Sequence, residues 1–255
     1  MSVAEYPAWH RANVLIRPEV ILHHAVIYPD AYTNVAAEVS TLTDKPLTIG
    51  ERLAPLGRPG AAERSLLDIV TFAPGGRAVH EHLYDPLTTP PAVVRRNYEA
   101  ARDAYSLEPA SRVRSTYALQ EYFVPEEGFD DFAAAMARIL TTHRANVLNV
   151  AVRHTRADLE SMLSWARSDV YSFVLYYQQG TSTAAKDRVH AWTRELIDAA
   201  LAAGGCHYLP YQIHASGAQF LAGYPRAAEF FALKRRIDPD YKFRNRLWDA
   251  YYDHR

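Results

Sequence analysis

Residues 116–124 read TYALQEYFV and residues 129–140 read FDDFAAAMARIL, and these two segments open the pattern that decides the fold. The first is rich in aromatic residues and is followed by Pro125, which predicts a strand that ends there. In the second, apolar residues recur at three- and four-residue intervals, which predicts an amphipathic helix. They are Phe129, Phe132, Ala133, Met136, Ile139 and Leu140.

Two strands, a helix and a further strand follow in the same stretch. Apolar residues alternate with other residues over 147–154 and over 171–178, so one face of each predicted strand belongs to the core. A helix is predicted from about residue 184, because Val189, Trp192 and Leu196 lie on one stripe. Gly204-Gly205 supplies a residue able to take the left-handed conformation past its end, and residues 206–213 are predicted as the last strand.

The resulting order is strand, helix, strand, strand, helix, strand. This order is typical of a ferredoxin-like βαββαβ antiparallel sheet with helices on one face. The sequence therefore predicts an α+β fold in which residues 92–255 form the main domain. Residues 1–91 are predicted as an extension with strands, broken up after residue 41 by repeated prolines.

Local signals place further elements around this stretch. Strands are predicted at residues 21–28 and 65–73, and a helix is predicted from Val94 to Tyr105. Ser216 and Gln219 have the spacing of a capping box, Pro225 suits the first turn of the next helix, and Asp238-Pro239 ends that helix. We expect Lys234 and Arg235 on its exposed side, whereas the tail is expected to pack Phe243, Leu247 and Trp248 inward.

Composition narrows the functional classes. A net charge of −1 gives no field that would attract nucleic acid or anionic lipid. Cys206 is the single cysteine, so an intrachain disulfide is impossible. The first eleven residues lack the pattern of a secretory signal, and no apolar run reaches the length of a membrane span, so we expect a cytoplasmic protein.

Two short motifs resemble functional sites but are explained more simply. His80-Glu81-His82 has two histidines that a strand would place on one face, yet no third metal ligand is evident in the sequence. Gly75-Gly76-Arg77 is too short for a nucleotide-binding loop and suits a hairpin turn. No metal site is therefore expected.

Three segments carry a family resemblance: residues 119–125 (LQEYFVP), residues 204–211 (GGCHYLPY), and residues 224–245 from Tyr224-Pro225-Arg226 to Asn245. They resemble the substrate half of flavin-dependent oxidases of the vanillyl-alcohol oxidase/p-cresol methylhydroxylase superfamily. The similarity is greatest to the branch of sugar-lactone and alditol oxidases and decaprenylphosphoryl ribose oxidases. It covers roughly residues 90–250, and residues 22–30 resemble the strand by which the family leaves its flavin domain.

The resemblance implies that residues 92–255 are a substrate (cap) domain and that residues 1–91 are a remnant of the link from a flavin domain. The implied reaction is hydride transfer to FAD from a carbon that bears a hydroxyl group in a small substrate. FAD would be held through a separate flavin domain and weakly, or not at all, by this chain alone. A homodimer is the other expected partner, because a polar sheet face and an unpaired strand near Ile21 would need cover. The alternative is a non-catalytic binding or interaction protein that keeps the cap fold.

The resemblance also implies site residues. Glu121 and Tyr211 are the predicted catalytic residues, and Tyr211 stands where the family has a lysine. A phenol at that position can donate a hydrogen bond or, if its pKa is lowered, act as a base.

The remaining candidates would bind substrate or flavin. The predicted substrate-binding residues are Arg153, Tyr176, His207 and His214, and the predicted flavin contacts are Tyr208 and Asn245. Five of the candidates have a structural alternative: solvated or salt-bridged surface charge for Glu121 and Arg153, aromatic packing for Tyr211, a backbone contact for His214 and a turn for Asn245.

Overall fold

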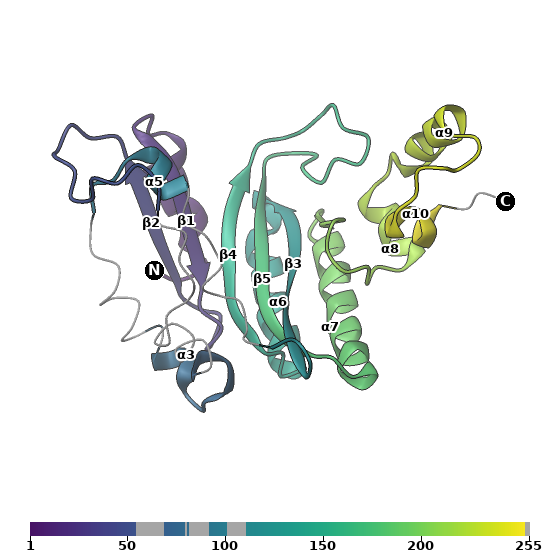
Figure 1. Ribbon diagram of the computed structural model, residues 1–255, viewed down its shortest axis with the longest axis horizontal. Coiled ribbons are helices and arrows are strands. Elements are labelled where there is room, and N and C mark those ends of the chain that lie inside the picture. The colour runs from purple at the N-terminus through teal and green to yellow at the C-terminus, as the bar shows by residue number, and fades with distance from the viewer. Residues whose placement is uncertain (55–68, 80, 82–91, 101–110, 253–255) are drawn as a thin grey trace.

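A computed structural model describes residues 1–54, 69–79, 81, 92–100 and 111–252 of the chain. Its centre is one six-stranded sheet in the order β2-β1-β4-β5-β3-β6, and every neighbouring pair is antiparallel (Figure 1). The fold is α+β, as the sequence predicted. The strands are β1 (Val20–Ile27), β2 (Val35–Thr41), β3 (Ser115–Pro125), β4 (Val147–Thr155), β5 (Val170–Gly180) and β6 (Cys206–His207).

Two long helices cover one face of this sheet. They are α6 (Phe129–Thr142) and α7 (Thr183–Ala202), both close to their predicted positions. The apolar stripe of α6 packs with alternate residues of β3, β4 and β5, and α7 adds its own stripe to the same core. Within the described residues, no helix combines the length and apolar character needed to cross a membrane.

Strands β1 and β2 extend the same sheet beyond β4. β1 lies between β2 and β4, so the expectation of an unpaired strand near Ile21 is wrong. The amino-terminal segment forms α1 (Tyr6–His10) and a π-helical turn, η1 (Arg11–Leu15), and Val3 and Tyr6 belong to the core shared with α6. The strands of residues 1–91 therefore continue the sheet of the main domain.

The proline-rich region departs from two predictions. Residues 69–72 are helical where a strand was expected, and residues 65–68 of that prediction lie outside the described part of the chain. Gly75, at φ +73°, precedes the helical turn α3 (Gly76–Val79), so the expected hairpin is absent from these described residues. The helix predicted over 94–105 appears as α5 (Arg96–Ala100); residues 101–105, like His80 and His82, lie outside the described residues.

Strand β6 is much shorter than the strand predicted over residues 206–213. The backbone N–H of Tyr208 still donates to the Glu121 carbonyl oxygen at 2.9 Å. Pro210 has no N–H with which to continue the ladder, and the chain leaves β3. The approach of this segment to β3 is very close, because a Cβ at Gly205 would lie 1.9 Å from the Phe123 carbonyl oxygen.

The carboxy-terminal helices lie beyond α7 (Figure 1). The predicted capping box of Ser216 and Gln219 opens α8 (Gly217–Gly223). Pro225 lies just before α9 (Ala227–Ile237) rather than in its first turn, and Asp238 ends that helix as predicted. The short helix α10 (Arg246–Tyr251) follows α9. A 3-10 turn, η4 (Glu126–Gly128), lies between β3 and α6.

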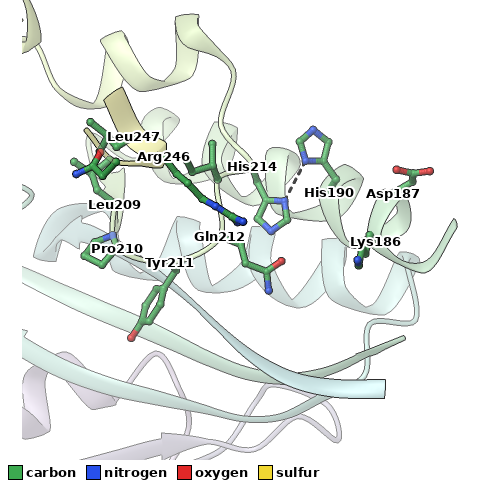
Figure 2. A pocket seen from close by; sticks show the side chains of 12 residues that line it. Lys186, Asp187, His190, Leu209, Pro210, Tyr211, Gln212, His214, Arg246 and Leu247 are labelled. Atoms are coloured by element: carbon green, nitrogen blue, oxygen red, sulfur yellow. Dashed lines mark hydrogen bonds between the residues drawn. The ribbon is translucent and has the colours of Figure 1, made fainter. Parts of the chain in front are cut away.

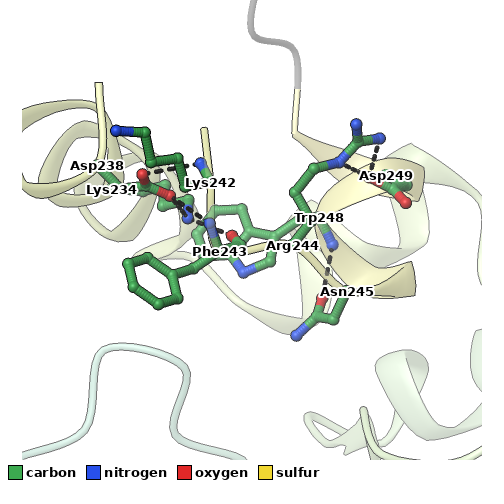
Figure 3. Close-up of polar contacts among 8 residues, drawn as sticks. All are labelled: Lys234, Asp238, Lys242, Phe243, Arg244, Asn245, Trp248 and Asp249. Carbon is green, nitrogen blue, oxygen red and sulfur yellow. Dashed lines mark hydrogen bonds and ion pairs between the residues drawn. The ribbon is translucent and has the colours of Figure 1, made fainter. Parts of the chain in front are cut away.

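Two side chains of the tail lie on the opposite side from the one predicted. Lys234 is buried, because its ammonium group contacts Asp238 Oδ2 and the Phe243 carbonyl oxygen (Figure 3). Phe243 is exposed, although its backbone N–H donates to Asp238 Oδ2. Trp248 is buried, as predicted, and Leu247 is half-buried.

Candidate functional site

The candidate site lies on the face of the sheet opposite α6 and α7. The strand register brings two rows of residues side by side on this face, because residues paired across an antiparallel ladder point the same way. One row contains Glu121, Val174 and Ala151, and the next contains Phe123, Ser172 and Arg153. Glu121 and Arg153 come from β3 and β4, which are separated by β5, so tertiary pairing alone brings them together.

Glu121 is a buried carboxyl group on this face of the sheet. Burial raises its pKa, while a hydrogen bond from the Ser172 hydroxyl and the positive charge of Arg153 act in the opposite direction. No salt bridge joins Glu121 and Arg153 directly within the described part of the chain. A carboxyl group of raised pKa can accept a proton more readily than an exposed one.

Tyr211 reaches the same place from the irregular segment after β6. Burial raises the pKa of Tyr211, the negative charge of Glu121 raises it further, and Arg153 opposes both. The phenol therefore stays protonated at neutral pH and acts as a hydrogen-bond donor. The condition for the alternative role as a base, a lowered pKa, is not met.

Aromatic rings lie beside the polar group formed by Glu121, Arg153 and Tyr211. Trp165, from the β4–β5 connection, stacks on Phe123 with ring centroids 4.2 Å apart. Tyr208 packs edge-on against Phe123 at 5.5 Å and lies 5.3 Å from Tyr211. Trp165 was missed by sequence reasoning, because an aromatic residue in a loop carries no signal of which face it will cover.

Tyr176 shares the face of Glu121 but lies further along the sheet. Its ladder partners are Leu119 and Asn149, two residues from the row of Glu121 on each strand. Its ring stacks on Tyr117 at 5.3 Å, in a small cluster with Val70 and Leu148. Tyr176 is thus a neighbour of the polar group, with a packing role of its own.

His207, a predicted substrate-binding residue, lies on the face of the sheet opposite Glu121. It pairs with Tyr122 across β3 and β6, so it points toward the helix side and lies 5.7 Å from the ring of Tyr224. Burial lowers the pKa of His207 to about 4, and its Nδ1 atom has no hydrogen-bond partner among the described residues. The parity of the strand explains why His207 and Glu121 lie on different faces.

His214 lines a cleft of about 740 Å³ beyond the end of β6 (Figure 2). Its Nδ1 atom lies 3.1 Å from Nδ1 of His190 on α7. Burial lowers the pKa of His214 to about 4, and the charges of His190 and Arg194 act in the same direction. Figure 2 shows Tyr211 pointing away from this histidine pair, so the structure does not bring His214 into the group of Glu121.

Asn245 also lines the cleft, but its side chain caps a helix. Its Oδ1 atom accepts a hydrogen bond of 3.0 Å from the Trp248 backbone N–H at the start of α10 (Figure 3). This contact corresponds to the turn-forming alternative stated for Asn245. Its predicted contact with flavin has no separate support from this geometry.

The structure thus brings together Glu121, Arg153, Tyr208 and Tyr211 of the predicted set. In the described residues no group of three His, Cys, Asp or Glu side chains is arranged to hold a metal ion. In comparisons with known proteins, no family model matches the chain and no curated protein matches it. The chemistry of the site must therefore be argued from its own groups.

Proposed function

We propose that this chain is the substrate-binding (cap) half of an FAD-dependent oxidoreductase that acts on CH–OH groups. The observation that carries the proposal is the convergence of Glu121, Arg153 and Tyr211 on the sheet face opposite the helices. The strand order β4-β5-β3-β6, with α6 and α7 on one face, supports assignment of the sheet as ferredoxin-like. A group of polar side chains on such a sheet is suited to a small hydroxylated substrate.

Each residue has a role that follows from its charge state. Glu121, with its raised pKa, takes the proton of the substrate hydroxyl at a carboxylate oxygen. Tyr211 donates a hydrogen bond to a substrate oxygen through its protonated phenol. Arg153 is exposed and charged, and its guanidinium holds a second oxygen by its fork of N–H donors.

The donor set fits the ring end of a flavin. Arg153 and Tyr211 supply N–H and O–H groups suited to carbonyl oxygens, and the half-buried ring of Tyr208 supplies a flat apolar surface beside them. When bound, FAD supplies the acceptor for the hydride. The dinucleotide portion would be held by a flavin domain outside this chain, which would act as the partner.

A second candidate is a binding protein that has kept the fold without the chemistry. The observation in its favour is Tyr211 itself, because the related oxidases are expected to have a lysine there and burial keeps this phenol protonated. In this reading, Glu121 and Arg153 recognise a ligand but no bond is broken. The two functions differ in whether a flavin is reduced.

The test is co-expression of the chain with a flavin domain of the resembled family. We expect the chain alone to purify colourless and the complex to show flavin absorbance that is bleached by a hydroxylated substrate. Glu121→Gln and Tyr211→Phe should slow bleaching at least tenfold without loss of the complex, whereas the exposed Glu38→Gln should not.

Two results would overturn parts of the proposal. Stoichiometric FAD in the chain purified alone would contradict the half-protein assignment. A complex that holds flavin but is never bleached, together with ligand binding that depends on Glu121 and Arg153, would favour the binding protein instead.

A further inference from the structure

A cluster of aromatic and imidazole rings joins the amino-terminal segment to the helix side of the sheet. We call His10, His23 and His154, together with Tyr6 and Tyr171, the histidine cluster. The ring of His10 lies 4.9 Å from that of His23 and 5.3 Å from that of His154. His10 and Tyr6 belong to α1, whereas the other three residues belong to β1, β4 and β5.

Hydrogen bonds tie the segment to the sheet through this cluster. Nδ1 of His10 lies 3.0 Å from the Tyr171 hydroxyl, and Nε2 of His23 lies 3.3 Å from the Tyr6 hydroxyl. His10 is 1% exposed and Tyr6 is 0% exposed. The rings of Tyr6 and Tyr171 also pack on Phe129 of α6, so the cluster seats the segment on the main core.

The surroundings of the cluster favour the neutral form of its imidazoles. Burial lowers the pKa of His10 to about 3, and the charges of His23, His154 and Arg11 lower it in the same direction. Burial lowers the pKa of His23 to about 4, with help from His24 and His154.

The charged groups around the cluster provide little compensation for protonation. Burial lowers the pKa of His154, Asp169 just before β5 opposes this effect, and Arg156 adds to it. On η4, Glu126 is already paired with Arg11 of η1. Among the residues that the structure describes, Asp169 is therefore the carboxylate that favours protonation of the cluster, and it acts on His154.

We propose that the histidine cluster is an acid-sensitive latch that releases residues 1–16 from the sheet while the α6–α7 core stays folded. Imidazoles that become exposed on release have the ordinary pKa of 6.5, so they bind protons more tightly than the same imidazoles do in the cluster. At pH 5, each histidine that is neutral in the latched state favours release by about 30-fold, and His10 with His23 by about 10³-fold. Apart from the cluster, the segment is held by the packing of Val3 in the core, by the ion pair of Arg11 with Glu126 and by backbone contacts with residues 33–35.

Hydrogen exchange of the full chain, measured by mass spectrometry and corrected for the intrinsic effect of pH, tests the latch. From pH 7.5 to pH 5, peptides from residues 1–16 should lose protection while peptides from residues 129–202 keep it. Equal protection of residues 1–16 at both values would overturn the proposal. Loss of protection in both regions together would overturn it as well, because that result indicates global unfolding.

A double variant separates titration from packing. In His10→Asn with His23→Gln, each amide can replace the imidazole nitrogen that is hydrogen-bonded, yet neither amide titrates. We expect the variant to lose the acid-induced release, whereas the control His143→Gln, which removes a histidine paired with Glu195 away from the cluster, should keep it. Release of the double variant at pH 5 to the extent seen in the unmodified chain would contradict the latch; if the double variant does not fold, each single variant should reduce release by about 30-fold.

Discussion

His207 stands opposite Tyr122 in the ladder between β3 and β6, which turns its imidazole to the face of the sheet opposite Glu121. Tyr208, the next residue, is turned to the face of Glu121 and packs on Phe123. Successive residues of a strand point to opposite faces, so these two neighbouring site candidates lie in different environments. The polar group of Glu121, Arg153 and Tyr211 and the buried histidines on the helix side of the sheet can therefore be tested separately.

Glu121 is expected to reduce stability at neutral pH, because a buried carboxyl group of raised pKa is ionised at a cost. Its contribution becomes less favourable as the pH rises from 4.5 through the raised pKa of the folded state. Glu121→Gln should therefore stabilise the chain by about 1 kcal/mol at pH 7.5 and have little effect at pH 4. Urea unfolding followed by circular dichroism measures this, with Glu38→Gln as the control; destabilisation by Glu121→Gln at pH 7.5 would contradict it.

Acid should weaken the fold through its buried histidines. Their folded pKa values lie below the ordinary 6.5, so the stability they support is complete above pH 6.5 and is lost as the pH falls toward 4. For His10, His207 and His214 together, we expect a loss of roughly 5 kcal/mol between pH 6.5 and pH 5. Urea midpoints across this range measure the loss, and a flat profile would show that these imidazoles are not neutral in the fold.

Lys234 should be essential to the carboxy-terminal region. Its ammonium group is 5.1 Å from the ring centroids of both Tyr241 and Trp248, and it neutralises Asp238, whose pKa is lowered to about 2. Lys234→Ala leaves a carboxylate and the Phe243 carbonyl oxygen without this donor, so the melting temperature should fall by several degrees. Lys242→Ala removes an exposed lysine of the same segment and should change it little; equal effects of the two variants would count against the buried contact.

Gly205 is predicted to be irreplaceable, because any Cβ would collide with the backbone of β3. The collision is with carbonyl oxygen and carbon of Phe123, which cannot move without breaking the β3–β6 pairing. Gly205→Ala should cost more than about 3 kcal/mol, whereas Gly217→Ala, with nothing within 4 Å of the added methyl group, should be neutral or slightly stabilising. Thermal melts of the two variants provide the comparison, and a mild effect of Gly205→Ala would show that β6 can shift.

Much of the fold could be predicted from local patterns. The alternation of β4 and β5 and the apolar stripes of α6 and α7 placed these elements within a few residues of their observed bounds. The patterns failed where local chemistry competed with periodicity, as at Pro210, which stops β6 after His207. They also failed for Lys234, because the helical pattern gives no sign that this lysine pairs with Asp238 and is buried.

The sequence by itself determined the α+β class and the order of elements, because side-chain periodicity is a property of each segment alone. Only the tertiary structure decided that Glu121, Arg153 and Tyr211 converge and that His10, His23 and His154 form a cluster. Those groups come from strands, helices and loops distant along the chain, and ladder register and helix packing fix which of them meet. Burial then set their charge states, since the cost of a charge depends on surroundings that no single segment supplies.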